Sequence, residues 1–244
     1  MRKIYSYLLI TSLAALILVL PVRASEGTSV PAGVQIEVPG DIPLHITNFA
    51  FDPSPSSMTA FHYDIQNSAG QGLVAVEVRW QTQLAGKSGV TVTNRDDRWL
   101  TGQLATGQSE RFQVTNVPNS VPSAAAAQAK TASQQLSGMV ATVTYAEFED
   151  GTRLGSDVAV IGKEIDTARR TAVAAYAKLL DTFNASGSEA LVQALKLQNA
   201  AHDQSSAVQE ATARLLGILS DQGVDAVVQE LQRVAALPIP EGRS

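Results

Sequence analysis

The stretch that decides the fold is Val74-Ala75-Val76-Glu77-Val78-Arg79-Trp80-Gln81, in which apolar and polar residues alternate. The valines and Trp80 fall on one face of an extended chain, whereas Glu77 and Arg79 fall on the other. A shift of the register by one residue would bury both charges. We therefore expect a β-strand that turns one face to a core and the other to solvent.

Turn residues separate this strand from other extended segments on both sides. The hairpin signal Asp150-Gly151 joins the last two, because both central residues of such a turn favour positive φ. Seven short strands of this kind predict an antiparallel two-sheet β-sandwich. The further segments that we expect to be strands are 44–51, 58–67, 90–93, 111–115, 139–148 and 153–158.

Two stretches interrupt or precede the strand series. Residues 25–43 are predicted to be an extended lead-in, in which Val34, Ile36 and Val38 alternate and could add an edge strand. Residues 124–135 are rich in alanine and predict a short surface helix with Ser123 as its N-cap, and a flexible connection is the alternative.

Aromatic residues mark the same strands that carry the alternation. Phe61 and Tyr63 lie on the second strand, Trp80 ends the third, and Tyr145 precedes the final hairpin. On these residues, segment 44–160 resembles the immunoglobulin-like and fibronectin-like sandwiches of bacterial envelope proteins. The paired cysteines of antibody domains are absent, and Tyr145 comes late in its strand. The resemblance implies a binding or spacer role and no particular chemistry.

After about Asp157 the apolar period changes from two residues to about 3.6. Stripes at spacings of three and four predict helices that end at Asn184-Ala185-Ser186-Gly187, restart at Ser188 and continue to Pro238. The second and third helices could be continuous, because residues 201–205 contain no Gly or Pro. The fold class is α+β, with an antiparallel helical bundle over 161–237 and a tail over 238–244. The predicted stripes are Val173, Tyr176, Leu180 and Phe183; Leu191, Leu195 and Ala201; Val208, Ala211, Leu215 and Ile218; and Val224, Val227, Leu231 and Val234.

The N-terminus has the pattern of an export signal. Arg2 and Lys3 precede an uncharged run to Val22, and Val22-Arg23-Ala24 fits a cleavage site. We expect residues 1–24 to be removed after Ala24, which places the protein in the periplasm or outside the cell; an uncleaved membrane anchor is the alternative. The chain has no cysteine, so its stability must come from packed cores.

The charge balance limits the partners. Removing Arg2, Lys3 and Arg23 leaves 15 of the 18 basic residues against 23 acidic ones, a net charge near −8. Nucleic acids attract basic surfaces, so we expect no nucleic-acid partner, and we expect a mature chain that does not span a membrane. An envelope protein or polymer is a possible partner, and the sequence leaves the oligomeric state open.

The sequence predicts no catalytic, cofactor-binding or metal-binding residues. His62 and Asp64 share the outer face of one strand, where we expect a solvated pair. Glu147, Glu149 and Asp150 at the hairpin are expected to be solvated turn charges, as are Asp96 and Asp97. The best recognition candidate is Arg95-Asp96-Asp97-Arg98-Trp99, because Trp and Arg are frequent at interaction hot spots.

These features favour an exported, non-catalytic binding or adaptor module of the bacterial cell envelope. One alternative is an envelope hydrolase that uses surface carboxylates. Glu147 and Glu149 are two residues apart on an extended chain, which would place both on one face at a distance suited to an acid and a base. A second alternative is a structural spacer that assembles with itself through its helical half.

Overall fold

The computed structural model describes residues 33–52, 58–84, 87–118, 136–201 and 204–237. The predicted signal peptide 1–24, residues 25–32 of the predicted lead-in, the predicted helix over 124–135 and the tail 238–244 lie outside these residues. The chain divides into two compact units, with the boundary between Val158 and Ala159. We call the unit before this boundary the sheet unit and the one after it the helical unit.

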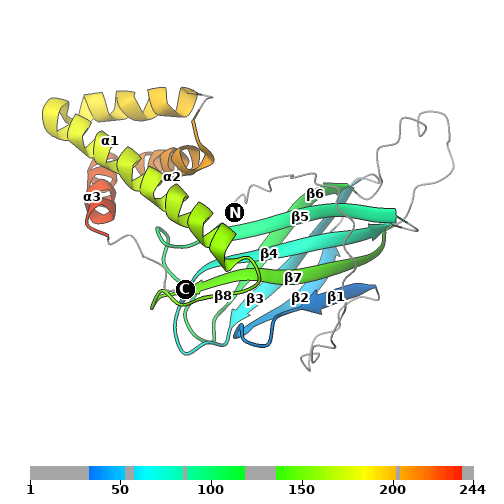
Figure 1. The fold of residues 1–244 in the computed structure, drawn as a ribbon. Coiled ribbons are helices and arrows are strands. Elements are labelled where there is room, and N and C mark those ends of the chain that lie inside the picture. The colour runs from blue at the N-terminus through cyan, green and yellow to red at the C-terminus, as the bar shows by residue number, and fades with distance from the viewer. Residues whose placement is uncertain (1–32, 53–57, 85–86, 119–135, 202–203, 238–244) are drawn as a thin grey trace, which may run out of the picture. The chain divides into compact units, whose positions relative to one another are not determined.

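The sheet unit carries eight strands in its described residues, arranged in two sheets (Figure 1). One sheet has the order β1-β7-β4-β5, with β8 also paired to β7, and the other has the order β2-β3-β6. All pairings are antiparallel except that of β1 with β7. The strands are β1 (Val34–Glu37), β2 (Leu44–Asp52), β3 (Met58–Asn67), β4 (Leu73–Leu84), β5 (Lys87–Asp97), β6 (Ser109–Pro118), β7 (Leu136–Phe148) and β8 (Arg153–Leu154).

Six of the seven predicted strands are confirmed, most of them longer than expected; the one predicted over 153–158 begins where expected, but its predicted extent is wrong. β8 ends at Leu154, and a helix already begins at Val158. Gly155 adopts φ +123°, and a Cβ there would lie 2.3 Å from the carbonyl oxygen of Thr144. The chain thus leaves the sheet by crossing closely over β7, a path that glycine permits.

The hairpin between β7 and β8 is confirmed, with a different turn from the one expected. Gly151 has φ +84°, whereas no positive φ occurs at Asp150. The Asp150 carboxylate instead accepts the backbone N–H of Thr152 at 2.8 Å. A local side-chain acceptor therefore stabilises the turn, where the sequence suggested two residues of positive φ.

The alternating lead-in does add an edge strand, as the sequence suggested. β1 pairs with β7 in parallel, with Val34 opposite Met139 and Glu37 opposite Thr142. β8 pairs with the same strand further along, where Ala146 is opposite Leu154. Two short strands from opposite ends of the sheet unit therefore cover successive parts of one edge of β7.

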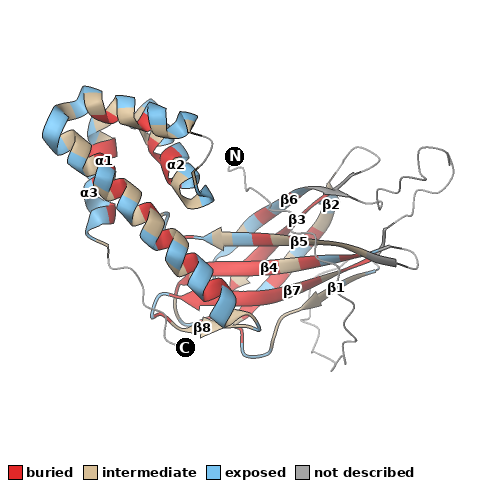
Figure 2. Cartoon of the chain, turned by 45° about the horizontal axis from the view of Figure 1, so that its top comes forward, coloured by how far each residue is buried: buried red, intermediate tan, exposed pale blue. Residues whose placement is uncertain are grey.

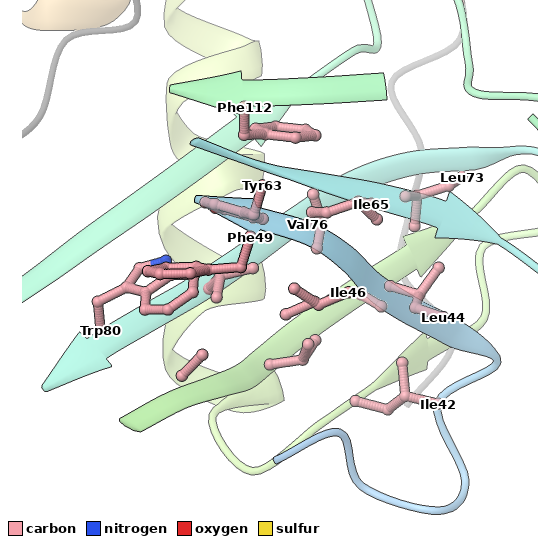
Figure 3. Close-up of a cluster of buried hydrophobic side chains, with 14 of the residues drawn as sticks. Ile42, Leu44, Ile46, Phe49, Tyr63, Ile65, Leu73, Val76, Trp80 and Phe112 are labelled. Carbon is pink, nitrogen blue, oxygen red and sulfur yellow. The ribbon is translucent and has the colours of Figure 1, made fainter. Parts of the chain in front are cut away.

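Side chains from both sheets form one hydrophobic cluster, centred on aromatic rings (Figure 3). Trp80 of β4 is fully buried, and its ring centroid lies 4.7 Å from that of Phe61 and 4.9 Å from that of Tyr63, both on β3. Phe49 of β2 lies 5.3 Å from Trp80. Buried residues follow β4 and β7 through the middle of their sheet (Figure 2). The inward face that the sequence predicted for Val76, Val78 and Trp80 is confirmed.

The helical unit contains three helices in its described residues, the first of which is broken. α1 (Val158–Ala200) contains Gly187 at φ 77° and ψ −171°, so the predicted end of a helix at Gly187 is confirmed as a kink. α2 (Ser206–Gln222) and α3 (Val224–Ala235) follow. A continuous helix through residues 201–205 is wrong, because α1 ends at Ala200 and Ser205 has an extended backbone. No helix in the described ranges combines the length and apolarity needed to cross a bilayer.

The buried stripe of α1 is displaced from the predicted one. Tyr176 is buried as expected, but its buried neighbours are Ala172 and Leu179. Val173 and Leu180 are only half-buried. In α2 and α3 the predicted positions Ala211, Leu215, Val227, Leu231 and Val234 are buried.

A polar cluster joins the helices of this unit. Glu230 of α3 accepts hydrogen bonds from Arg214 of α2 at 3.1 Å and from Arg233 at 2.7 Å. Burial would raise the pKa of Glu230, but hydrogen bonds and charges from these two guanidinium groups outweigh it and hold the pKa below its usual value. Tyr176 of α1 is close enough to Arg214, Glu230 and Arg233 for their charges to act on its hydroxyl. Burial is the largest effect and raises the pKa of Tyr176 to about 12.

Replacing Phe61 with Ala should destabilise the sheet unit strongly. Phe61 is fully buried against Trp80, and the loss of a buried aromatic ring costs about 3–5 kcal/mol. Phe51 provides the matched control, because it is 43% exposed and the same substitution removes less buried area. Urea unfolding followed by tryptophan fluorescence measures both, and equal losses would contradict the assignment of the core.

The stabilisation from Glu230 should depend on pH. A lowered folded-state pKa gives stability that is present above the unfolded-state pKa of about 4.3 and is lost as the pH falls through the folded value. The stability difference between the wild type and Glu230→Gln should therefore be largest near neutral pH and shrink on acidification. Helix unfolding measured by circular dichroism across pH, with the exposed Asp181→Asn as control, tests this. A stability difference that is constant with pH would refute it.

Candidate functional site

The recognition candidate predicted from the sequence lies at the end of β5 and in the turn that follows. Strand periodicity divides it into two sets of side chains. Asp96 is paired opposite Val76, whose side chain belongs to the core, whereas Arg95 is opposite Glu77 on the other face. The five predicted residues therefore do not form one exposed surface.

Arg98 is buried and bridges the two sheets. Its side chain donates to Asp96 Oδ2 at 2.6 Å and to Glu110, which lies on β6 of the other sheet. Only 6% of Arg98 is exposed. We call Arg98, Asp96 and Glu110 the Arg98 bridge. Its position between edge strands of different sheets makes it a structural element, so two of the five predicted recognition residues are not free to bind a partner.

Burial and charge act in opposite directions within the Arg98 bridge. Burial raises the pKa of Asp96, although the charge of Arg98 acts to lower it. Burial lowers the pKa of Arg98, but the charges and hydrogen bonds of Asp96 and Glu110 outweigh this effect and raise it. The guanidinium group is thus charged at any physiological pH and holds two carboxylates that would otherwise repel each other.

The backbone of Arg98 also fixes the turn after β5. Its N–H donates to the carbonyl of Val74 at 2.7 Å, and its carbonyl accepts N–H groups from Thr101 and Gly102, each at 2.9 Å. Gly102 has φ +95°. The segment after β5 is therefore held at both its side chain and its main chain.

Arg95, Asp97 and Trp99 remain accessible, and we call them the Trp99 patch. Arg95 and Asp97 are exposed, and Trp99 is half-buried. Arg95 also pairs with Glu77 at 2.6 Å, and Asp97 accepts the backbone N–H of Trp99 at 3.2 Å. The patch therefore presents an indole, a cation and an anion on a segment that the Arg98 bridge holds in place.

Glu77 does not face solvent, contrary to the prediction from the alternating strand. It is 2% exposed and accepts a hydrogen bond from Thr144 Oγ1 at 2.9 Å in addition to the Arg95 pair. The chain after β8 covers this region, because the N–H of Asp157 donates to the Thr144 carbonyl at 3.1 Å and its carboxylate pairs with Arg79 at 2.6 Å. The sequence could not show this cover, which comes from residues far along the chain.

Glu147 is also buried, which corrects its assignment as a solvated turn charge. The hydroxyl of Tyr145 donates to its Oε2 at 2.6 Å, and Arg153 lies 3.5 Å from the same oxygen. Glu149 follows the end of β7 and is exposed, and Asp150 bonds to Thr152 within the turn. The carboxylates of Glu147, Glu149 and Asp150 therefore do not form one exposed group. No cluster of three or more side chains that could bind a metal ion occurs in the part of the chain that the structure describes.

His62 and Asp64, which share a face of β3, each have another partner. His62 Nδ1 lies 2.7 Å from Asp52 Oδ1, while Asp64 accepts hydrogen bonds from Asn48 at 2.7 Å and Arg111 at 3.0 Å. Burial would raise the pKa of Asp64, but these hydrogen bonds and the Arg111 charge hold it below its usual value. These contacts tie neighbouring strands of one sheet together.

Comparison with protein-family models, with curated proteins and with solved structures gave no match. The candidate site is therefore defined by the geometry of this chain alone.

Replacing Arg98 with Met should destabilise the sheet unit by about 3 kcal/mol, because it leaves Asp96 and Glu110 facing each other without their cation. Arg111→Met is the matched control: Arg111 pairs with Asp64, but its side chain is 63% exposed, so its loss should cost less than about 1 kcal/mol. Urea unfolding of both variants at neutral pH gives the comparison. A loss for Arg98→Met no larger than that for Arg111→Met would mean that the bridge does not hold the sheets together.

Proposed function

We propose that this protein is an exported, non-catalytic binding or adaptor module of the bacterial cell envelope, and that it binds an envelope protein or polymer through the Trp99 patch. The observation that carries the proposal is the division of one segment into a part anchored by the Arg98 bridge and a part that is accessible. Arg98 and Asp96 anchor the segment, while Arg95, Asp97 and Trp99 stay accessible. A rigidly held Trp and Arg lose little conformational entropy on binding, which favours affinity.

The cellular location in this proposal rests on the sequence of residues 1–24. A short basic start, an apolar run and a small residue before the cleavage point are typical of a signal peptide. We propose release into the periplasm or the medium after cleavage near Ala24, with an uncleaved anchor as the alternative. The excess of acidic residues argues against a nucleic-acid partner.

We further propose that the sheet unit is an immunoglobulin-like sandwich. Strands divide between the sheets in a similar way to that fold: β2, β3 and β6 take the places of strands A, B and E, and β4, β7 and the two-residue β8 those of C, F and G, while β5 pairs with β4 at the edge of the second sheet. Trp80 lies on β4, the place of the buried Trp on strand C, and packs on Phe61 of β3, the place of strand B. An aromatic contact would then replace the disulfide of antibody domains.

For the helical unit we propose an antiparallel bundle. Gly223 alone separates α2 from α3 and adopts φ 86°, so the chain turns sharply between them. The ion pair between Arg214 and Glu230, 3.0 Å long, joins the same two helices. Short connections of this kind favour antiparallel neighbours.

The hydrolase alternative is less well supported. It needs two accessible carboxylates across a cleft, and Glu147 is fully buried between Tyr145 and Arg153. A carboxylate in such contacts stabilises the fold and is not available to a substrate. The geometry therefore favours binding over hydrolysis.

The test is capture of envelope components by the immobilised protein, followed by affinity measurement of whichever component is retained. Trp99→Ala should weaken binding about thirtyfold or more, the effect typical of a hot-spot residue. Phe51→Ala, which removes another exposed aromatic ring from a different sheet, should bind like the wild type. Circular dichroism checks that both variants fold. Unchanged affinity in Trp99→Ala would overturn the patch, and retention of no component at any salt concentration would overturn the binding function.

A further inference from the structure

The segment of α1 after the kink at Gly187 has an outward face with an ordered charge pattern. Glu189, Val192, Gln193 and Lys196 are spaced at i, i+3, i+4 and i+7, so they lie on one face of the helix. Together with Ser188 and with Val224 of α3 they line an open hollow of about 400 Å³. Leu197, adjacent to this face, is 65% exposed, the largest exposure among the large apolar side chains described.

The two charged residues on this face, Glu189 and Lys196, lack partners among the described residues of the chain. Neither Glu189 nor Lys196 takes part in an ion pair or a side-chain hydrogen bond with the other residues that the structure describes. They are seven residues apart, or about 10 Å along the helix axis, so they do not pair with each other. The face thus carries an acid at one end, a base at the other, and Val192 and Gln193 between them, and its two charges are left unpartnered.

We propose that this face is a docking surface for a second copy of the chain, in which two copies of the helix segment 188–200 pack antiparallel about a two-fold axis. An axis that passes between Val192 and Gln193 places Glu189 of one copy against Lys196 of the other, and the symmetry repeats the pair. The pattern is self-complementary only in this antiparallel arrangement, because a parallel one would set like charges against each other.

The energetics indicate a weak, salt-sensitive dimer. One helix pair buries a small area, and exposed ion pairs are screened by salt. The proposal concerns the helical unit and does not rest on the binding function proposed for the Trp99 patch.

A charge-swap experiment tests the proposal. The protein is expressed in a bacterial host with its own N-terminal segment and studied by sedimentation equilibrium at low salt. Lys196→Glu and Glu189→Lys each set like charges against each other twice, and each should raise the dimer dissociation constant about tenfold or more. The double variant Glu189→Lys/Lys196→Glu restores both pairs in reversed polarity and should return the constant to within about threefold of the wild type.

Lys178→Glu is the matched control, because Lys178 is exposed on the same helix before the kink and the substitution makes the same change in net charge. It should leave the dissociation constant unchanged. A wild-type protein that stays monomeric at millimolar concentration would overturn the proposal. So would a double variant that dimerises no better than the single ones, because a general effect of charge does not predict rescue.

Discussion

The contact between Trp80 and Phe61 is the interaction on which the sheet unit depends. It joins β4 of one sheet to β3 of the other, and Tyr63 and Phe49 pack on the same indole. A chain without cysteine cannot hold two sheets together covalently. Aromatic rings are the largest apolar surfaces available for this purpose, and their burial favours a single arrangement of the sheets. The Arg98 bridge adds a polar contact between the edge strands of two sheets whose centres are held together by the aromatic rings.

The positions of the strands could be predicted because alternation is a local property. The burial of Glu77 and Glu147 could not, because it depends on partners and on a covering segment that only the tertiary structure brings near. The same limit explains the displaced stripe of α1. Periodicity gave weight to the larger Val173, whereas the buried position belongs to the small Ala172. For β1 the sequence indicated a strand, but its parallel partner lies more than a hundred residues away.

The recognition candidate shows how far residue type alone can lead. Trp and Arg in one short segment drew attention to the end of β5, but residue type does not distinguish a guanidinium group that supports the fold, as in Arg98, from one on the surface, as in Arg95. Strand periodicity makes that distinction here: Asp96 faces the core with its partner Arg98, and Arg95 faces outward. The charges that form the Arg98 bridge and the charges on the outward side of the segment thus have separate roles. Because the Arg98 bridge fixes the segment, the residues of the Trp99 patch hold a defined position at the surface.

Because β1 and β8 cover the edge of β7, the order in which these strands form affects the risk of aggregation during folding. β7 is a long, largely apolar strand, and an open edge of this kind recruits strands from other molecules. β8 follows β7 directly in the chain and can close its part of the edge at once, whereas β1 was made long before and must return to it. Until it does, the edge near Met139 is open to aggregation.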